Sequence, residues 1–450
     1  MAPAPNMPEK LIWQTFYNTG LLMLTQENIN PFEAIVMSEQ QITAESSTSD
    51  FVAQADRWGA HNYHPLDVVL TRGEGCYVWD VDGNQYLDCL AAYSAVNQGH
   101  CHPRIVGALQ RQAARLTLTS RAFHNDRMGV FLEKLCQTLG YERALPMNTG
   151  AEAVETALKA TRKWGYKVKG VEADCAEIIV MDGNFHGRTT TIVSFSTDEQ
   201  ARDGFGPFTP GFKIVPYGDV DAVAAAITPN TVGVLVEPIQ GEGGVVLPPD
   251  GFLTALATIC RDANVLLIGD EVQTGLGRTG KLIACEWEEV RPDVLILGKA
   301  LGGGVYPVSA VLADAAIMDV FTPGDHGSTF GGNPLAAAVG LESLAVLLDE
   351  GLIEHARELG DWFVERLRAI ESPHVELVRG RGLMVGVVIR ESSGPARPFC
   401  KALKRRGILA KETHEQVIRF APPLVITREI LEGILPEIEA VLLGDDVDLG

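Results

Sequence analysis

Short apolar runs alternate with helix-like stretches through the middle of the chain. Four runs consist mainly of Val, Ile and Leu: EIIVM at 177–181, VGVLVEP at 232–238, VLLIGDE at 265–271 and DVLILGK at 293–299. Stretches with helical periodicity lie at 104–118, 151–164 and 253–263. Buried strands that alternate with helices predict a parallel sheet covered on both faces.

The two ends of the chain carry a different pattern. Residues 68–88 read VVLTRGEGCYVWDVDGNQYLD, two β-rich runs broken by Asp-Gly, which predicts a hairpin. After Pro334 a long apolar helix at 335–348 leads into a mixed tail with strand-like runs at 382–389 and 417–420. We therefore expect an α/β protein with a mostly parallel central sheet covered by helices. A smaller α+β domain should be formed from both chain ends.

The expected domain boundaries follow these changes of pattern. They are an N-terminal extension, loosely ordered, at 1–45; a segment at 46–100 that packs with the small domain; the large domain at 101–340; and the small C-terminal domain at 341–450. The extension contains internal methionines at 7, 23 and 37. One hypothesis is that Met37 is the true start.

Composition excludes several classes of function. The 450 residues carry a net charge of −21, which argues against a nucleic-acid or anionic-membrane surface. No apolar run is long enough to span a bilayer. The eight cysteines are scattered without a C-x-x-C pair, and residues 1–40 lack the features of a targeting segment. We therefore expect a soluble, cytoplasmic enzyme.

Two reactive residues follow two of the apolar runs. Asp270 and Lys299 each lie just past a strand-like run, where open α/β sheets bind their ligands. A desolvated lysine suits Schiff-base chemistry, and an aspartate at the neighbouring strand end suits a pyridinium nitrogen. Each residue alone has an ordinary alternative: a surface loop lysine for Lys299 and a helix N-cap for Asp270.

Other candidates are weaker when taken singly. Asn-Thr-Gly-Ala opens an alanine-rich helix, so the N–H groups of Gly150 and Ala151 could hold a phosphate. Arg188 and Arg419 are candidate carboxylate clamps, although ordinary ion pairs are the commoner fate of an arginine. The histidines of HNYH and GHCHP have no spacing that suits a metal, and no Walker lysine–serine pair is present.

Longer sequence motifs contain several of these candidate residues. DEVQTGLGRTG followed by LGKALGGG resembles the class III, ω-amino-acid branch of the aminotransferases that use pyridoxal 5′-phosphate (PLP), fold type I. NQGHCHP, LTLTSRAF and FGPFTPGF are similar to the ornithine-using members, and the likeness covers residues 55–440. Two departures are His186, where a tryptophan is usual, and GEGG after Glu242 in place of GEAG.

The resemblance implies a role for each candidate. Lys299 would bind the PLP cofactor covalently and move the substrate proton, and Asp270 would pair with the ring nitrogen. The other cofactor-binding residues would be Phe185 stacking on the ring, Gln273 at its phenolic oxygen, Gly150 and Ala151 at the phosphate, and Ser328 and Thr329 reaching in from the partner of a homodimer. The substrate would be held by Tyr63, Tyr93, Arg188 and Arg419, with Glu242 as the gate over Arg419.

The implied reaction is the ping-pong transfer of the δ-amino group of L-ornithine to a 2-oxo acid, mainly 2-oxoglutarate. It yields glutamate and glutamate 5-semialdehyde, which cyclises to pyrroline-5-carboxylate and so links arginine degradation to proline biosynthesis. The alternatives are another ω-aminotransferase acting on N-acetylornithine, 4-aminobutyrate or lysine, a decarboxylase or mutase of the same fold, and a non-catalytic scaffold. Among these possibilities, Tyr93 favours ornithine as the substrate, because its hydroxyl suits a polar α-amino group.

Overall fold

The computed structural model describes residues 47–448, and the chain divides into two units, Met1–Val69 and Leu70–Gly450. In the first unit, helix α3 (Thr48–Trp58) begins with a capping box in which Ser47 and Asp50 exchange side-chain and backbone hydrogen bonds. The expected extension at 1–45 and the start hypothesised at Met37 lie outside the described residues.

The second unit is built on a seven-stranded sheet with the order β4-β10-β9-β8-β7-β5-β6. Strands β9, β8, β7, β5 and β6 run parallel, whereas β10 is antiparallel to both of its neighbours. The mostly parallel sheet is thus confirmed, and β5 coincides with the run EIIVM. The strands are β4 (Arg143–Met147), β5 (Glu177–Met181), β6 (Phe212–Val215), β7 (Thr231–Val236), β8 (Leu266–Asp270), β9 (Val294–Leu297) and β10 (Ser309–Ala313).

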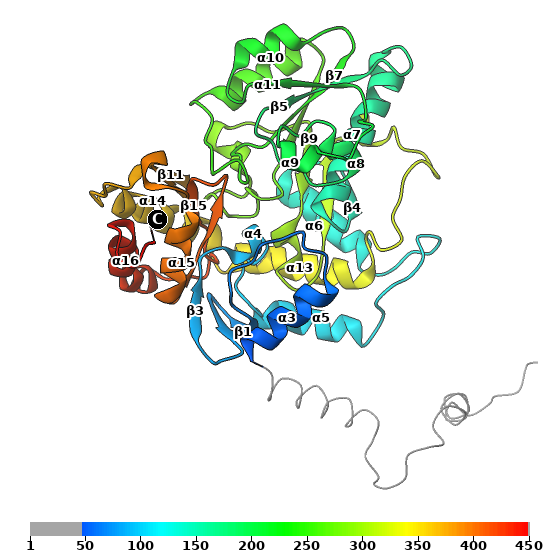
Figure 1. The fold of residues 1–450 in the computed structure, drawn as a ribbon. Helices are drawn as coiled ribbons and strands as arrows, with labels where there is room; N and C mark the ends of the chain where they lie inside the picture. Colours follow the sequence, from blue (N-terminus) through cyan, green and yellow to red (C-terminus); the bar gives the residue numbers. More distant parts are fainter. Residues whose placement is uncertain (1–46, 449–450) are drawn as a thin grey trace, which may run out of the picture. The chain divides into compact units, whose positions relative to one another are not determined.

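Both faces of this sheet are buried, which explains why its strands read as unbroken apolar runs. Along β5, Ile178 and Val180 pack into one hydrophobic cluster, while Ile179 and Met181 pack into another. Helix α7 (Gly150–Trp164) packs on the first face, against β7, β9 and β10 (Figure 1), and α11 (Phe252–Asp262) joins the second cluster. The helices predicted at 151–164 and 253–263 are therefore confirmed within one residue.

Two predicted elements need correction. The helix expected at 104–118 is α5 (Pro103–Ala113), which ends earlier than predicted, and just beyond its end the Gln112 side chain donates to the Leu116 carbonyl at 2.8 Å. Residues 68–88 form three antiparallel strands, not two: β1 (Leu70–Glu74), β2 (Tyr77–Asp80) and β3 (Gln85–Asp88). The first run divides at Gly75, where φ is +58°.

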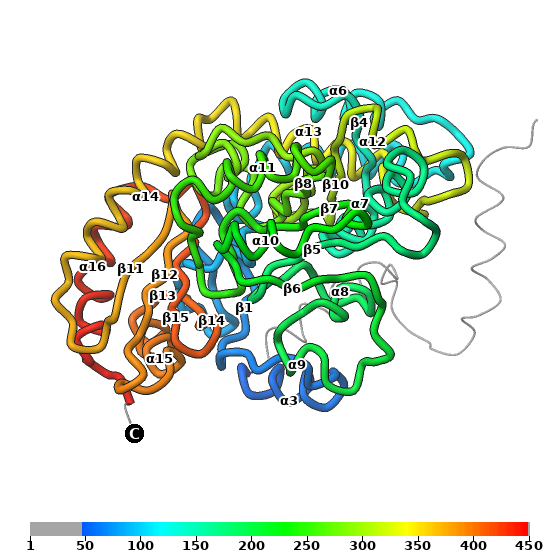
Figure 2. Tube along the Cα trace, turned by 90° about the horizontal axis from the view of Figure 1, so that it is seen from above, coloured from blue at the N-terminus to red at the C-terminus, as the bar shows by residue number. Residues whose placement is uncertain are grey.

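The C-terminal segment joins this N-terminal sheet. Strand β13 (Ile408–Leu409) pairs in parallel with β3, and a further sheet has the order β11-β12-β15-β14. Figure 2 shows the segments from β11 to α16, orange to red, gathered at one end of the second unit. The elements are β11 (Val375–Arg381), β12 (Met384–Ile389), α15 (Arg397–Arg405), β14 (Lys411–Thr413), β15 (Val417–Phe420) and α16 (Arg428–Leu442).

Long helices connect the two regions. The apolar helix predicted at 335–348 is α13 (Pro334–Asp349), which Asn333 caps, and it leads into α14 (Leu352–Arg368). The other α-helices of the described residues are α4 (Ala91–Ser94), α6 (Met128–Leu139), α8 (Thr190–Val193), α9 (Glu199–Arg202), α10 (Val220–Ala226) and α12 (Ala315–Met318). Among residues 47–448, no helix is long and apolar enough to cross a membrane.

Candidate active site

The carboxyl ends of four neighbouring strands bring the reactive residues together. In the order β9-β8-β7-β5, Lys299 follows the first strand, Asp270 ends the second and Glu237 follows the third. The segment 182–188 leaves the fourth strand. These residues, with Gly150, Ala151 and Gln273, line a cavity of about 180 Å³, several times the ~30 Å³ share of one water molecule.

Asp270 lines this cavity and is only 5% exposed. Its Oδ1 accepts a hydrogen bond from Val272 N at 3.0 Å, and its Oδ2 lies 2.6 Å from His186 Nδ1. Burial acts to lower the pKa of His186, but the hydrogen bond and charge of Asp270, together with Glu237, raise it above the ordinary value. His186 therefore holds a proton toward Asp270, while its buried Nε2 has no partner among the described residues.

Glu237 is a further carboxyl group of this site, and the sequence analysis assigned it no role. Its oxygens accept hydrogen bonds from Phe185 N at 2.9 Å and Gly241 N at 3.4 Å. Burial raises the pKa of Glu237 to about 7, with Asp270 adding to the shift and His186 opposing it. The signal was present, because Glu237 ends the apolar run VGVLVEP just as Asp270 ends its own run.

Lys299 begins the 3-10 helix η3 (Lys299–Gly302) and has a φ of +44°. Burial lowers its pKa below the ordinary value and Arg419 acts in the same direction, while Glu242 and Asp270 oppose the shift. Within the described chain, no hydrogen bond or ion pair holds the ammonium group. Lys299 thus faces the cavity and does not project from a surface loop, and its amine is available for covalent chemistry.

The first turn of α7 forms another wall of the cavity. Thr149 caps the helix by accepting from Glu152 N, and the Glu152 carboxylate accepts from the N–H groups of Asn148 and Thr149. No group in the described residues accepts from the N–H of Gly150 or Ala151. A Cβ at Gly150 would lie 2.9 Å from Val272, so glycine keeps this helix start open. The N-terminus of α7 is therefore suited to bind an anion such as a phosphate group.

Arg419 approaches from β15 and is 1% exposed. Its Nη1 donates to Glu242 Oε1 at 2.8 Å and to Gln273 Oε1 at 3.0 Å, and Gln273 Nε2 donates to the same Glu242 oxygen at 3.1 Å. Burial would raise the pKa of Glu242, but the charges of Arg419 and Lys299 and these hydrogen bonds lower it. The structure thus brings together the predicted gate and clamp, and places Gln273 between them.

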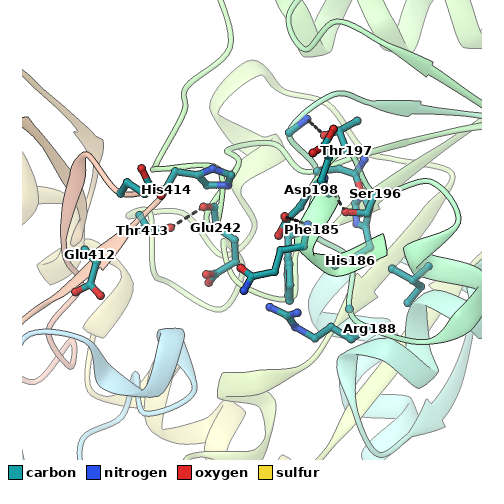
Figure 3. A pocket seen from close by; sticks show the side chains of 18 of the residues that line it. Phe185, His186, Arg188, Ser196, Thr197, Asp198, Glu242, Glu412, Thr413 and His414 are labelled. Carbon is teal, nitrogen blue, oxygen red and sulfur yellow. Dashed lines mark hydrogen bonds between the residues drawn. The ribbon is translucent and has the colours of Figure 1, made fainter. Parts of the chain in front are cut away.

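A larger pocket of about 680 Å³ adjoins the first (Figure 3). The two cavities share Phe185 and His186, and the outer one is also lined by Arg188, Glu242 and the segment 411–415. Arg188 lies with its Cζ 5.6 Å from the centre of the Phe185 ring. Thr413 donates to the backbone carbonyl of Glu242 at 2.6 Å, which joins the β14 hairpin to the gate.

The Tyr93 ring lies beside the guanidinium group of Arg419. Its ring centre is 5.0 Å from Arg419 Cζ, within the range of a cation–π contact. It belongs to α4, whose four residues all have positive φ although none is glycine. Left-handed residues cost about 1–2 kcal/mol each, so this turn is strained.

Three further predicted residues are Tyr63, Ser328 and Thr329. Tyr63 belongs to the first unit and is 67% exposed. Ser328 accepts a hydrogen bond from Asn148 Nδ2 at 2.8 Å, and Thr329 is exposed. Their predicted approach to the cofactor of a partner subunit stays a prediction.

The histidines of GHCHP each contact a carboxylate. His100 Nε2 lies 2.7 Å from Asp88 Oδ2, and His102 Nε2 lies 3.3 Å from Glu350 Oε2. In the part of the chain that the structure describes, no group of three His, Cys, Asp or Glu side chains could hold a metal ion.

Comparison with known proteins defines the class. The family model "Aminotransferase class-III" matches residues 58–442, so this chain belongs to the class III aminotransferases. Members of this family depend on PLP, and the chain is accordingly a PLP-dependent transaminase.

Individual relatives narrow the comparison. The chain is 57% identical over 399 residues to an ornithine aminotransferase of Geobacillus sp. (strain WCH70), covering 89% of this chain and 100% of the relative. A solved ornithine aminotransferase of Toxoplasma gondii, with PLP partly occupying its active site, has a TM-score of 0.90 and 46% identity over 94% of this chain and 99% of that one. An acetylornithine aminotransferase of Elizabethkingia anophelis has a TM-score of 0.81 and 49% identity over 88% and 99%.

The cavity at the strand ends fits PLP. The free N–H groups of Gly150 and Ala151 suit its phosphate, and the apolar face of Phe185 suits its ring. Asp270 suits a protonated ring nitrogen, and the unengaged amine of Lys299 suits its aldehyde. Each wall therefore offers the group that one part of this cofactor needs.

Proposed function

We propose that this enzyme transfers the δ-amino group of L-ornithine to a 2-oxo acid, mainly 2-oxoglutarate. The observation that carries the proposal is the buried Arg419 beside the Lys299 cavity, paired with Glu242 and faced by Tyr93. A site that must accept both a diamine and a dicarboxylate needs an arginine that can be neutralised in one half-reaction and exposed in the other. The likeness to the Geobacillus enzyme supports the same substrate.

When bound, the cofactor withdraws electrons from the carbon that carries the substrate amine and stores the amino group between half-reactions. Asp270 keeps a negative charge at the ring nitrogen, and His186 orients that carboxylate from behind. The amine of Lys299 takes up and returns the proton of the reacting carbon, for which a lowered pKa suits it. The first-turn N–H groups of α7 would hold the phosphate, and Phe185 would lie against the ring.

The outer wall selects the substrate. Arg188, Tyr63 and Tyr93 grip the α-carboxylate and α-amino group of ornithine, so the δ-amino end points toward Lys299. Glu242 neutralises Arg419 during this half-reaction. A dicarboxylate displaces Glu242, and its two carboxylates then bind Arg188 and Arg419. Arg419 needs a carboxylate partner in both half-reactions, because leaving a buried arginine unpaired costs several kcal/mol.

The proposal includes a homodimer in which Ser328 and Thr329 complete the neighbouring cofactor site. The support is an exposed apolar surface beside them: Phe123 is 69% and Phe330 48% exposed. Arg121 donates to the Gly331 carbonyl at 3.2 Å and joins these two segments. Light scattering should give twice the chain mass, whereas a monomer with full activity would refute the shared site.

The proposed location is the cytoplasm, and the proposed role links arginine degradation to proline biosynthesis. All eight cysteines are free thiols, which suits a reducing compartment. The product, glutamate 5-semialdehyde, cyclises to pyrroline-5-carboxylate.

The deciding experiment is the visible spectrum of the PLP-loaded protein. Ornithine alone should bleach the yellow band, and 2-oxoglutarate should restore it. A second candidate, N-acetylornithine, is supported by the similarity to the Elizabethkingia enzyme. Bleaching by N-acetylornithine with no response to ornithine would move the substrate to that candidate. A band that responds to neither amine would refute both.

A further inference from the structure

The turn that carries Tyr93 has the opposite hand to every ordinary protein helix. The φ values of Ala91, Ala92, Tyr93 and Ser94 are +48°, +46°, +60° and +71°. Only glycine, Asn and Asp visit this region routinely, and then as single residues. Four successive residues without a glycine therefore form a strained segment, which persists only when the surroundings hold it.

One buried carboxylate holds the start of the turn. Asp88 Oδ1 accepts from Leu90 N at 2.8 Å and from Ala91 N at 2.9 Å. Its other oxygen lies 2.7 Å from His100 Nε2, so the carboxylate is held on both sides. Inside the turn, Ala95 N donates to the Ala91 carbonyl at 2.9 Å.

The flanks of the turn are fixed to the segment that directly follows β15, the strand that carries Arg419. Ala421 N donates to the Cys89 carbonyl at 2.6 Å before the turn, and Leu424 N donates to the Asn97 carbonyl at 2.8 Å after it. Beyond the turn, Gln98 Nε2 donates to the carbonyl of Ala300, the residue next to Lys299, at 3.0 Å. Since these bonds fix both ends, the hand of the turn decides the direction of the Tyr93 Cα–Cβ bond.

We propose that the left-handed turn at 91–94, held by Asp88, is the positioning device that sets Tyr93 against Arg419 and so selects an amino donor with an α-amino group. The proposal rests on the proposed function. A right-handed turn between the same fixed ends would send the Tyr93 Cβ in another direction, because the Cα–Cβ bond follows the hand of the backbone. Strain is retained here because a relaxed turn would lose the contact between the ring and the guanidinium.

The test substitution is Asp88→Ala, which removes the oxygen that accepts from Leu90 N and Ala91 N and so no longer holds the strained turn. The substrates to compare are L-ornithine and 5-aminopentanoate, which differ only in the α-amino group. In D88A the kcat/KM preference for ornithine should fall at least threefold through KM. Adding Ala92→Gly to D88A should restore the preference, because glycine adopts positive φ without strain and favours the left-handed turn. Adding Ala95→Gly instead is the matched control and should restore nothing, because Ala95 has φ −84° and ψ −22°.

A second measurement separates this inference from the proposed function. Glutarate, an unreactive dicarboxylate, should bind the PLP-loaded D88A protein at least threefold more weakly, as read from the visible band, and Ala92→Gly should reverse this loss. If the unmodified enzyme does not turn over ornithine, the proposed function fails and glutarate affinity alone decides the role of the turn. A D88A protein with unchanged glutarate affinity and unchanged donor preference would overturn the inference, as would equal rescue by Ala92→Gly and Ala95→Gly. Asp88→Asn, which keeps one acceptor oxygen, should change the preference less than Asp88→Ala and replaces it in the test if the Asp88→Ala protein does not fold.

Discussion

The two walls of the active site are held in different ways. Lys299, Asp270 and Glu237 stand at the ends of adjacent strands, and the sheet fixes their spacing. On the other wall, Arg419 and Glu242 are 177 residues apart in the chain and hold each other. The proposed function requires the second wall to change partners while the first keeps its spacing, so we call the first the rigid wall and the second the movable wall.

The backbone around each carboxylate supports this contrast. Asp270 is the last residue of a buried strand, and His186 and Val272 N occupy its oxygens. Glu242 lies in the sequence Gly-Glu-Gly-Gly, where Gly244 has a φ of +101°. Glycine on both sides gives a loop the freedom to swing a side chain away from its partner. Under the proposed function, the chemistry is placed on the rigid wall and the choice of substrate on the movable one.

The largest effect is expected from Lys299→Ala on the rigid wall. Turnover should fall at least about 10³-fold, because the covalent amine and the proton-transfer group are lost together. Steady-state assays and thermal melting should show an inactive protein with an unchanged fold. Lys411→Ala is the control on the outer pocket and should cost far less. Activity of the Lys299→Ala protein within tenfold of the unmodified enzyme would contradict the assignment.

Asp270→Ala should weaken PLP binding and lower kcat by roughly 10²-fold, since a charge held in a dry site acts strongly on the ring. Asp270→Glu should recover part of both. The control is Glu271→Gln, because Glu271 points elsewhere and accepts from Cys285 N at 2.8 Å. Fluorescence titration of the apoprotein with PLP gives the affinity. Equal loss in the Asp270→Ala and Glu271→Gln proteins would mean that the whole strand end is at fault.

On the movable wall, Glu242→Ala should leave Arg419 always open. The ratio of kcat/KM for glutamate to that for ornithine should rise at least about tenfold, equivalent to ~1.4 kcal/mol. Glu412→Ala, a carboxylate of the same outer pocket paired with Arg397, should leave the ratio unchanged. An unchanged ratio in the Glu242→Ala protein would show that the pair is static and would remove the contrast between the walls.

The rigid wall was largely readable from the sequence. Asp270 and Lys299 follow runs of Val, Ile and Leu, and strand ends gather at one edge of a parallel sheet. The same argument applies to Glu237, which also ends an apolar run. His186 behind Asp270 depends on the path of the 182–188 segment, which no periodicity specifies.

The arrangement of the movable wall could not be predicted from the positions of strand ends. The pairing of Arg419 with Glu242 joins distant segments, so only resemblance suggested it. The left-handed turn at 91–94 has no sequence signal, because Ala-Ala-Tyr-Ser contains no glycine to mark positive φ. Contacts from Asp88 and from the segment after β15 impose it, and tertiary contacts of this kind override local preference.

The smallest effect on turnover, and a clear one on stability, is expected from Glu237→Gln. The ordinary pKa of a glutamate is 4.5 and the folded protein raises that of Glu237 to about 7, so the folded state binds more protons in this interval. The contribution of Glu237 to stability is therefore fully present below pH 4.5 and is lost as the pH rises to about 7.

Urea unfolding of the apoprotein at pH 5 and pH 8 measures this loss. The difference between the unmodified protein and the Glu237→Gln protein should shift by about 2–3 kcal/mol, the unmodified protein losing more at pH 8. Glu432→Gln, an exposed change on α16, should show no such shift. A difference that does not vary with pH would mean that Glu237 is ionised throughout. The rigid wall would then carry one more negative charge beside Asp270 than its burial and hydrogen bonds indicate.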